Sequence, residues 1–157
     1  MSTSIPSAPI AYTDLTQRPP RSFHTRLGGY VILARMLDKG RATLAGKNGE
    51  YKYAGGTDQH LVRFLGLDTE ALLQELASGK GDGEILAWVN ETAKTPRTPW
   101  EIEAWSAHFE KRGPDSDAET LADFAAYVGL HTKTREDIKT WFAAVELDDY
   151  VSFGGKA

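Results

Sequence analysis

The strongest constraint on the fold is a set of helix-start signals that recurs along the chain from residue 68 onward. In Thr98-Pro99-Trp100-Glu101, a hydroxyl residue is followed by proline at the first helical position and by glutamate at the third. The hydroxyl can accept a hydrogen bond from a free N–H at the helix start, and the glutamate can reach back to the capping residue. Ser116-Asp117-Ala118-Glu119 repeats this pattern, Thr134-Arg135-Glu136-Asp137 is a weaker version, and Asp68 is a further cap. These signals predict short, well-capped helices.

The apolar residues between these signals recur at the three- and four-residue spacing of a helix face. The five clearest stripes are Leu72-Leu73-Leu76, Ile85-Trp88-Val89, Ile102-Trp105-Phe109, Leu121-Phe124-Ala125-Val128 and Ile138-Trp141-Phe142-Val145. Upstream, one stripe begins at Leu27 and continues through Leu37, and another covers Asp58 to Leu65. The one strand-like stretch, residues 50–53, is too short to found a sheet. We therefore expect an all-α fold: a single compact domain of about six to seven short helices.

The two ends of the chain lack this periodicity. Residues 1–11 mix Ser, Pro and Ala, which predicts a disordered or surface-lying tail, and residues 151–157 are expected to form a flexible C-terminal tail. Pro19-Pro20 forces residues 17–22 into an extended arm, because proline removes a donor and biases its predecessor away from the helix. Residues 12–150 are then one helical domain with an extended N-terminal arm.

Composition excludes several classes of function. The chain has no cysteine, which excludes disulfides, thiolate metal sites and a cysteine nucleophile. No two of its four histidines stand three or four residues apart, and no complete glycine-rich phosphate motif is present, so neither a metal nor a cofactor is expected. No apolar run approaches the roughly 20 residues of a membrane span, and the first residues do not resemble a secretion signal. We expect a cytoplasmic protein without a membrane partner.

The charges are distributed unevenly along the chain. Residues 1–53 carry eight Lys or Arg and three acids, a net +5, whereas the remaining 104 residues carry ten bases and nineteen acids, a net −9. Either the basic segment packs on the acidic remainder and is neutralised there, or it frames a site for an anion. The overall pI of about 5.6 argues against a nucleic-acid partner, for which a basic domain with a pI above about 9 is expected.

Several segments resemble a bacterial family of unknown function, numbered 5069 among such families. The segments are residues 14–21 (DLTQRPPR), 26–30 (RLGGY), 35–42 (RMLDKGRA), 49–51 (GEY), 58–59 (DQ) and 138–142 (IKTWF). The resemblance covers about residues 12–147 and is specific enough to identify the family. It implies no reaction and no ligand.

The best candidate ligand-binding residues lie in the basic segment: Arg21, Arg26, Tyr30 and Arg35. A guanidinium presents a planar fork that matches a carboxylate or phosphate in two bonds, although structural ion pairs are the alternative role. Arg26 and Arg35 are nine residues apart, which would place them on opposite faces of a continuous helix. A shared anion site therefore requires Gly28-Gly29 to break or start the helix.

A second group of candidates could support proton transfer. Asp58, Tyr51 and His60 crowd a loop-to-helix region, where an acid, a phenol and an imidazole could act as catalytic residues. Asp58 could equally stabilise the helix dipole, and His60 could be an ordinary surface residue. Trp88 and Trp141 lie on apolar stripes, so they are candidates for pocket lining as well as core residues.

Two functions remain open at this stage. The first is binding of a small molecule, expected to be an anionic metabolite, by a protein that could be a cofactor-independent enzyme using acid–base chemistry. The second is a helical interaction module or self-associating adaptor whose basic N-terminal face docks an acidic partner. The sequence does not decide whether the chain is an enzyme, or whether it is a monomer or a homodimer.

Overall fold

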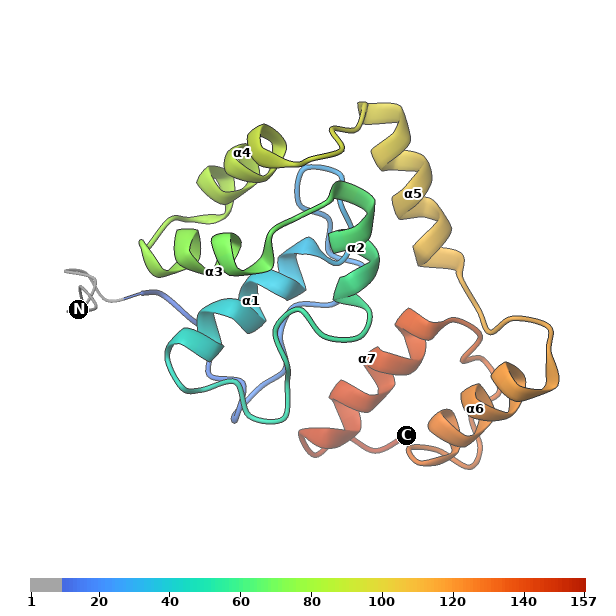
Figure 1. Cartoon of the computed structure of the whole chain (residues 1–157). Helices are drawn as coiled ribbons and strands as arrows, with labels where there is room; N and C mark the ends of the chain where they lie inside the picture. Colours follow the sequence, from blue (N-terminus) through green and yellow to red (C-terminus); the bar gives the residue numbers. More distant parts are fainter. Residues whose placement is uncertain (1–9) are drawn as a thin grey trace.

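A computed structural model describes residues 10–157, in which seven α-helices form a compact all-α domain (Figure 1). The helices are α1 (Leu33–Leu44), α2 (Asp58–Leu65), α3 (Thr69–Ala77), α4 (Asp82–Thr92), α5 (Pro99–Lys111), α6 (Ala118–Gly129) and α7 (Trp141–Ser152). This confirms the predicted fold class. Most of the predicted N-terminal tail, residues 1–9, lies outside the described residues. No helix from residue 10 onward is both long and apolar enough to cross a bilayer.

Two of the predicted caps form as expected. The Thr98 hydroxyl accepts a hydrogen bond from the Glu101 N–H at 3.2 Å, and the Glu101 carboxylate accepts one from the Thr98 N–H at 3.1 Å. Asp68 accepts hydrogen bonds from the N–H groups of Glu70 and Ala71. Local pattern therefore places the starts of α5 and α3 correctly.

The last two helix starts differ from the prediction. α6 is capped by Asp117 rather than Ser116, and α7 is capped by Thr140, six residues after the predicted cap at Thr134. Asp137 is held instead by the Arg135 guanidinium, with an Nε–Oδ1 distance of 2.7 Å. Asp137, whose side chain is shorter than the glutamate of the other patterns, is therefore bound by Arg135 and does not reach back to Thr134. Residues 133–140 are irregular.

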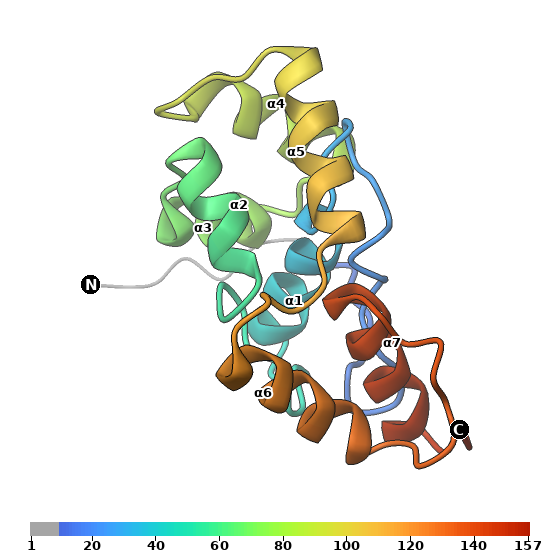
Figure 2. The same cartoon turned by 90° about the vertical axis from the view of Figure 1, so that its right-hand side faces the viewer.

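The domain has two regions that differ in how they are packed. In the main region, α2 to α5 surround α1, whose Leu33, Met36 and Leu37 are fully buried. In the C-terminal pair, which consists of α6 and α7, a small separate cluster is formed by Phe124, Ile138, Ala144 and Leu147. Both views show α6 and α7 together at one end of the molecule (Figures 1 and 2). One α7 residue, Phe142, joins the core of the main region.

The stripe that begins at Leu27 does not form a helix before Leu33. Gly28 and Gly29 have φ angles of 59° and 86°, and they form a tight turn closed by two 3.0 Å backbone hydrogen bonds between Leu27 and Tyr30. A Cβ atom on Gly28 would lie 2.4 Å from a Leu86 methyl carbon. Close packing against α4 and the positive φ angles of the two glycines therefore interrupt the helix.

A strained residue follows this turn. Ile32, which is fully buried, has a φ of 75° and a ψ of −41°, and around it the Leu33 N–H donates to the Val31 carbonyl at 2.8 Å. Such a γ-turn at a β-branched residue costs on the order of 1–3 kcal/mol. Ser106 of α5 holds the segment, because its hydroxyl accepts from the Val31 N–H and donates to the Gly29 carbonyl. The start of α1 is thus anchored by packing and by α5.

Candidate functional site

Most bases of the N-terminal segment are already paired with carboxylates elsewhere in the chain. The pairs are Arg21 with Asp38 and Asp82, Arg26 with Glu103 and Glu110, Arg35 with Asp149, Lys39 with Asp58, and Arg41 with Asp82. Of the two interpretations of the charge asymmetry, this geometry favours internal neutralisation. The three arginines proposed to hold one anion contact three different sets of acids.

A large cavity lies where α7 meets the main region. This seam pocket has a volume of about 720 Å³ and is bounded by α1, the loops of residues 49–52 and 55–57, and α7. Its charged lining residues are Arg35, Lys39, Glu50, Lys52, Asp148 and Asp149. Phe23, Leu15 and Val145 supply apolar surface. Its volume falls within the roughly 300–1,000 Å³ typical of small-molecule sites.

Arg35 and Asp149 form a buried two-bond ion pair at the wall of the seam pocket. The Nη1–Oδ2 and Nη2–Oδ1 distances are 2.7 and 3.1 Å, and Arg35 is only 3% exposed. The guanidinium lies over the Phe23 ring, with its carbon 4.6 Å from the ring centre. The Tyr51 hydroxyl donates to Asp149 at 2.8 Å, and burial together with this bond raises the Tyr51 pKa. Tyr51 is thereby kept protonated as a donor.

Lys39 and Asp58 form a second buried pair beside the first. The Lys39 Nζ lies 2.6 Å from the Asp58 Oδ2, and the Asp58 side chain has no exposed surface. Burial lowers the Lys39 pKa more than the attraction of Asp58 raises it, and the charge of Arg35 lowers it further. Burial likewise raises the Asp58 pKa despite the nearby lysine. Both shifts favour the neutral forms, so the free-energy difference between the ionic and neutral pair is reduced.

The structure brings only some of the candidate residues to this pocket. Arg35 and Tyr51 line it, and Asp58 contacts its lining residue Lys39. Arg21 is held by Asp38 on α1 and Asp82 on α4, and Arg26 reaches α5, so neither shares the site. The glycine turn separates Arg26 from α1 as the hypothesis required, but the acids of α5 hold the Arg26 side chain away from Arg35.

The remaining candidates lie elsewhere. Tyr30 is buried against α4, where its hydroxyl donates to Asn90 at 3.1 Å, and it borders a separate cavity of about 350 Å³. Trp88 packs on the core of the main region. His60 and Trp141 both border a third cavity, of about 260 Å³, between α2, α5, α6 and α7. The tryptophans are therefore first of all packing residues, and one of them also lines a cavity.

The sequence reasoning did not single out Lys39 or Asp149 as site residues. The available signal for Lys39 was its position four residues after Arg35, which places both side chains on one face of a helix. Asp149 carried no local signal, because its partner Arg35 is 114 residues away. Groups of three or more His, Asp or Glu side chains that could hold a metal are absent from residues 10–157.

Comparison with known proteins identifies the family without assigning a function. The family model for the Domain of unknown function (DUF5069) matches residues 17–151, which include α1 to α6, all of α7 except Ser152, and both buried pairs. A search of curated proteins found no match. Since the family model covers most of the chain, the protein belongs to the DUF5069 family.

Proposed function

We propose that the protein binds a small anionic molecule in the seam pocket and acts on it, without a cofactor, by acid–base chemistry at Lys39 and Asp58. The observation that carries this proposal is the 2.6 Å contact between two fully or nearly fully buried ionisable groups at the wall of a 720 Å³ pocket. Lys39 lines the pocket and so is the group that faces a ligand. Asp58 is its buried proton-exchange partner.

Stability alone does not account for these two groups. Apolar residues of similar size usually stabilise a fold as well as a buried ion pair does, because both charges must be removed from water. Titratable groups with perturbed pKa values beside a cavity are typical of functional sites. The lowered pKa of Lys39 and the raised pKa of Asp58 bring the two groups closer in proton affinity, which favours the proton exchange that general acid–base catalysis requires.

The Nε of Arg35, unpartnered within residues 10–157, favours a ligand with one anionic group. The lining contains the basic residues Arg35, Lys39 and Lys52 and the acids Glu50, Asp148 and Asp149. The buried Nε of Arg35 has no hydrogen-bond partner among the described residues, so an anion reaching it would supply the missing acceptor. Asp149 and Tyr51 position Arg35 for this contact.

The interaction-module alternative receives less support from the contacts. Five of the eight bases in residues 1–53 are committed to acids of the same chain, namely Arg21, Arg26, Arg35, Lys39 and Arg41. A face neutralised in this way attracts an acidic partner less strongly. The contacts thus support the pocket over the basic docking face.

A thermal-shift screen of small carboxylates and phosphate esters tests the proposal. A ligand present at about 100 times its Kd adds about 2.7 kcal/mol, which for a domain of this size raises Tm by roughly 5–10 °C. We expect Lys39→Met to abolish the shift caused by a ligand and Lys111→Met, on the exposed side of α5, to leave it unchanged. NMR spectra of the ligand incubated with the protein then report whether it is converted.

A second variant distinguishes loss of ligand binding from loss of folding. Lys39→Met leaves Asp58 buried without its partner, whereas the double variant Lys39→Met/Asp58→Leu removes both charges and retains an apolar contact. Loss of ligand binding in a folded double variant supports the proposal. A ligand that shifts the double variant as much as the wild type would show that this pair does not form the site.

A further inference from the structure

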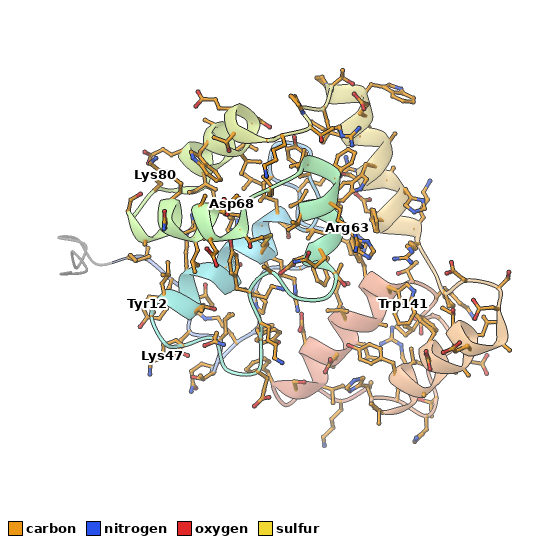
Figure 3. All side chains as sticks on the ribbon, viewed as in Figure 1. Tyr12, Lys47, Arg63, Asp68, Lys80 and Trp141 are labelled. Carbon is orange, nitrogen blue, oxygen red and sulfur yellow. The ribbon has the colours of Figure 1, made fainter. Side chains whose placement is uncertain are left out.

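The third cavity differs from the seam pocket in its charge. It has a volume of about 260 Å³ and lies where the main region meets the C-terminal pair, with His60 from α2, Arg112 after α5 and Trp141 from α7 among its lining residues. The lining contains no carboxylate. Figure 3 shows Trp141 at the junction of α6 and α7, and Arg63 on α2 beside α5. The cavity therefore presents positive charge and aromatic surface.

Arg112 is fixed in place yet has no acidic partner. Its carbonyl accepts a hydrogen bond from the Trp141 N–H at 3.0 Å, which ties the end of α5 to the start of α7. Its guanidinium carbon lies 5.8 Å from the centre of the Phe109 ring. Within residues 10–157 no carboxylate comes within ion-pair distance of it, in contrast to the five paired bases of the N-terminal segment.

The contacts of His60 show that positive charge is concentrated here. Its Nε2 lies 3.2 Å from the Arg112 Nη1, and its Nδ1 lies 3.2 Å from the Arg63 Nη2. A neutral imidazole has one acceptor nitrogen and one N–H, so one of these two contacts sets a donor against a donor. Burial, followed by the charges of Arg112, Arg63 and His108, lowers the His60 pKa. A bound anion would relieve both the donor conflict and the charge repulsion.

We propose that this cavity binds a small organic carboxylate, with the carboxylate held by Arg112 and the carbon skeleton packed against Trp141 and Phe142. One guanidinium matches a singly charged carboxylate in two bonds. The hydroxyls of Thr57 and Thr120 supply further polar contacts at the cavity wall. The volume lies below the roughly 300–1,000 Å³ of drug-sized sites, so the ligand is a small one. This site does not depend on Lys39 and Asp58.

The site adjoins the seam pocket, because Thr57 and Val145 line both cavities. A ligand at Arg112 would therefore lie on the opposite side of these two residues from Lys39. The two proposals are distinguishable experimentally: Lys39→Met tests the seam pocket, whereas the carboxylate site is tested at Arg112 and at the signals of Trp141 and His60.

Titration of the full-length protein with benzoate, followed by NMR, tests the inference. We expect benzoate to shift the indole signal of Trp141 and to raise the measured pKa of His60. Benzamide, which has the same ring and no charge, should do neither at the same concentration. This comparison of two ligands needs no variant, so it holds even if a substitution disturbs the fold. Equal responses to benzoate and benzamide, or no response at Trp141 and His60, would overturn the proposal.

Two variants and one further anion complete the test. Arg112→Gln should weaken benzoate binding at least tenfold, and Arg18→Gln, an exposed arginine of the N-terminal arm, should leave it unchanged. Circular dichroism confirms that each variant is folded. Inorganic phosphate carries charge without an apolar skeleton, and binding of phosphate in preference to benzoate would contradict the carboxylate assignment.

Discussion

The main region and the C-terminal pair are stabilised by different kinds of contact. Around α1, one continuous cluster of buried aliphatic and aromatic side chains joins α1 to α5 and includes Phe142 of α7. The small cluster of the pair α6–α7 has only four buried members. The contacts of the pair with the main region include the packing of Phe142, the Arg35–Asp149 ion pair and the hydrogen bond from Tyr51 to Asp149. Arg35, Lys39, Tyr51 and Asp149 line the seam pocket, where these two regions meet.

Removing the acid of the buried ion pair should have the largest effect. Asp149→Ala leaves the 3% exposed Arg35 without its counter-ion, and loss of one partner of a buried pair costs about 3–5 kcal/mol. Urea unfolding measures this change. Asp137→Ala, which breaks the exposed pair with Arg135, is the matched control and should leave the midpoint unchanged. Equal midpoints for both variants would mean that the two regions do not depend on the ion pair.

Equivalent truncations in the two clusters should separate their contributions. Leu72→Ala, at a fully buried position between α3 and α1, should destabilise the whole domain by about 2–5 kcal/mol. Leu147→Ala, in the small cluster, should fall at the lower end of that range and act locally. Hydrogen exchange should show faster exchange throughout the main region for the first variant and only in α6 and α7 for the second. Identical exchange patterns would indicate one cooperative unit.

Cap removal should have a smaller effect in both regions. Thr98 caps α5 and Thr140 caps α7, each accepting a backbone hydrogen bond. Thr98→Ala and Thr140→Ala should each cost about 1 kcal/mol, whereas Thr→Ser at the same positions keeps the acceptor. Thermal unfolding measures the loss. A larger loss for Thr140→Ala would show that the C-terminal pair depends more on its helix ends than on its core.

Acidification should have the smallest effect, through His60. Because burial, followed by the charges of Arg112, Arg63 and His108, lowers the His60 pKa below 6.5, the folded state binds fewer protons than the unfolded state just below that pH. The free energy of unfolding should therefore fall as the pH drops through 6.5. His60→Gln should flatten this part of the profile measured by urea unfolding. An unchanged profile would show that His60 titrates alike in both states.

Local pattern predicted the helices well and the site only in part. The bounds of α2 and the caps at Thr98 and Asp68 follow from neighbouring residues, and those contacts form in the structure. The acidic partners of the bases could not be predicted in this way. Arg35 contacts an acid 114 residues away, and Arg26 contacts acids 77 and 84 residues away. Periodicity carries no information about which charges meet across the fold. The sequence therefore pointed to Arg35, Tyr51 and Asp58 as candidates, but it did not predict the Arg35–Asp149 and Lys39–Asp58 pairs.

The long separation between Arg35 and Asp149 also has a consequence for the order of assembly. Contacts between residues far apart in sequence carry a large loop-closure entropy, and domains begin to fold while synthesis proceeds from the N-terminus. By the time residue 149 leaves the ribosome, α1 to α5 can already surround their core. The seam pocket forms only when α7 docks, so a nascent chain has neither the pocket nor the Arg35–Asp149 ion pair until that step.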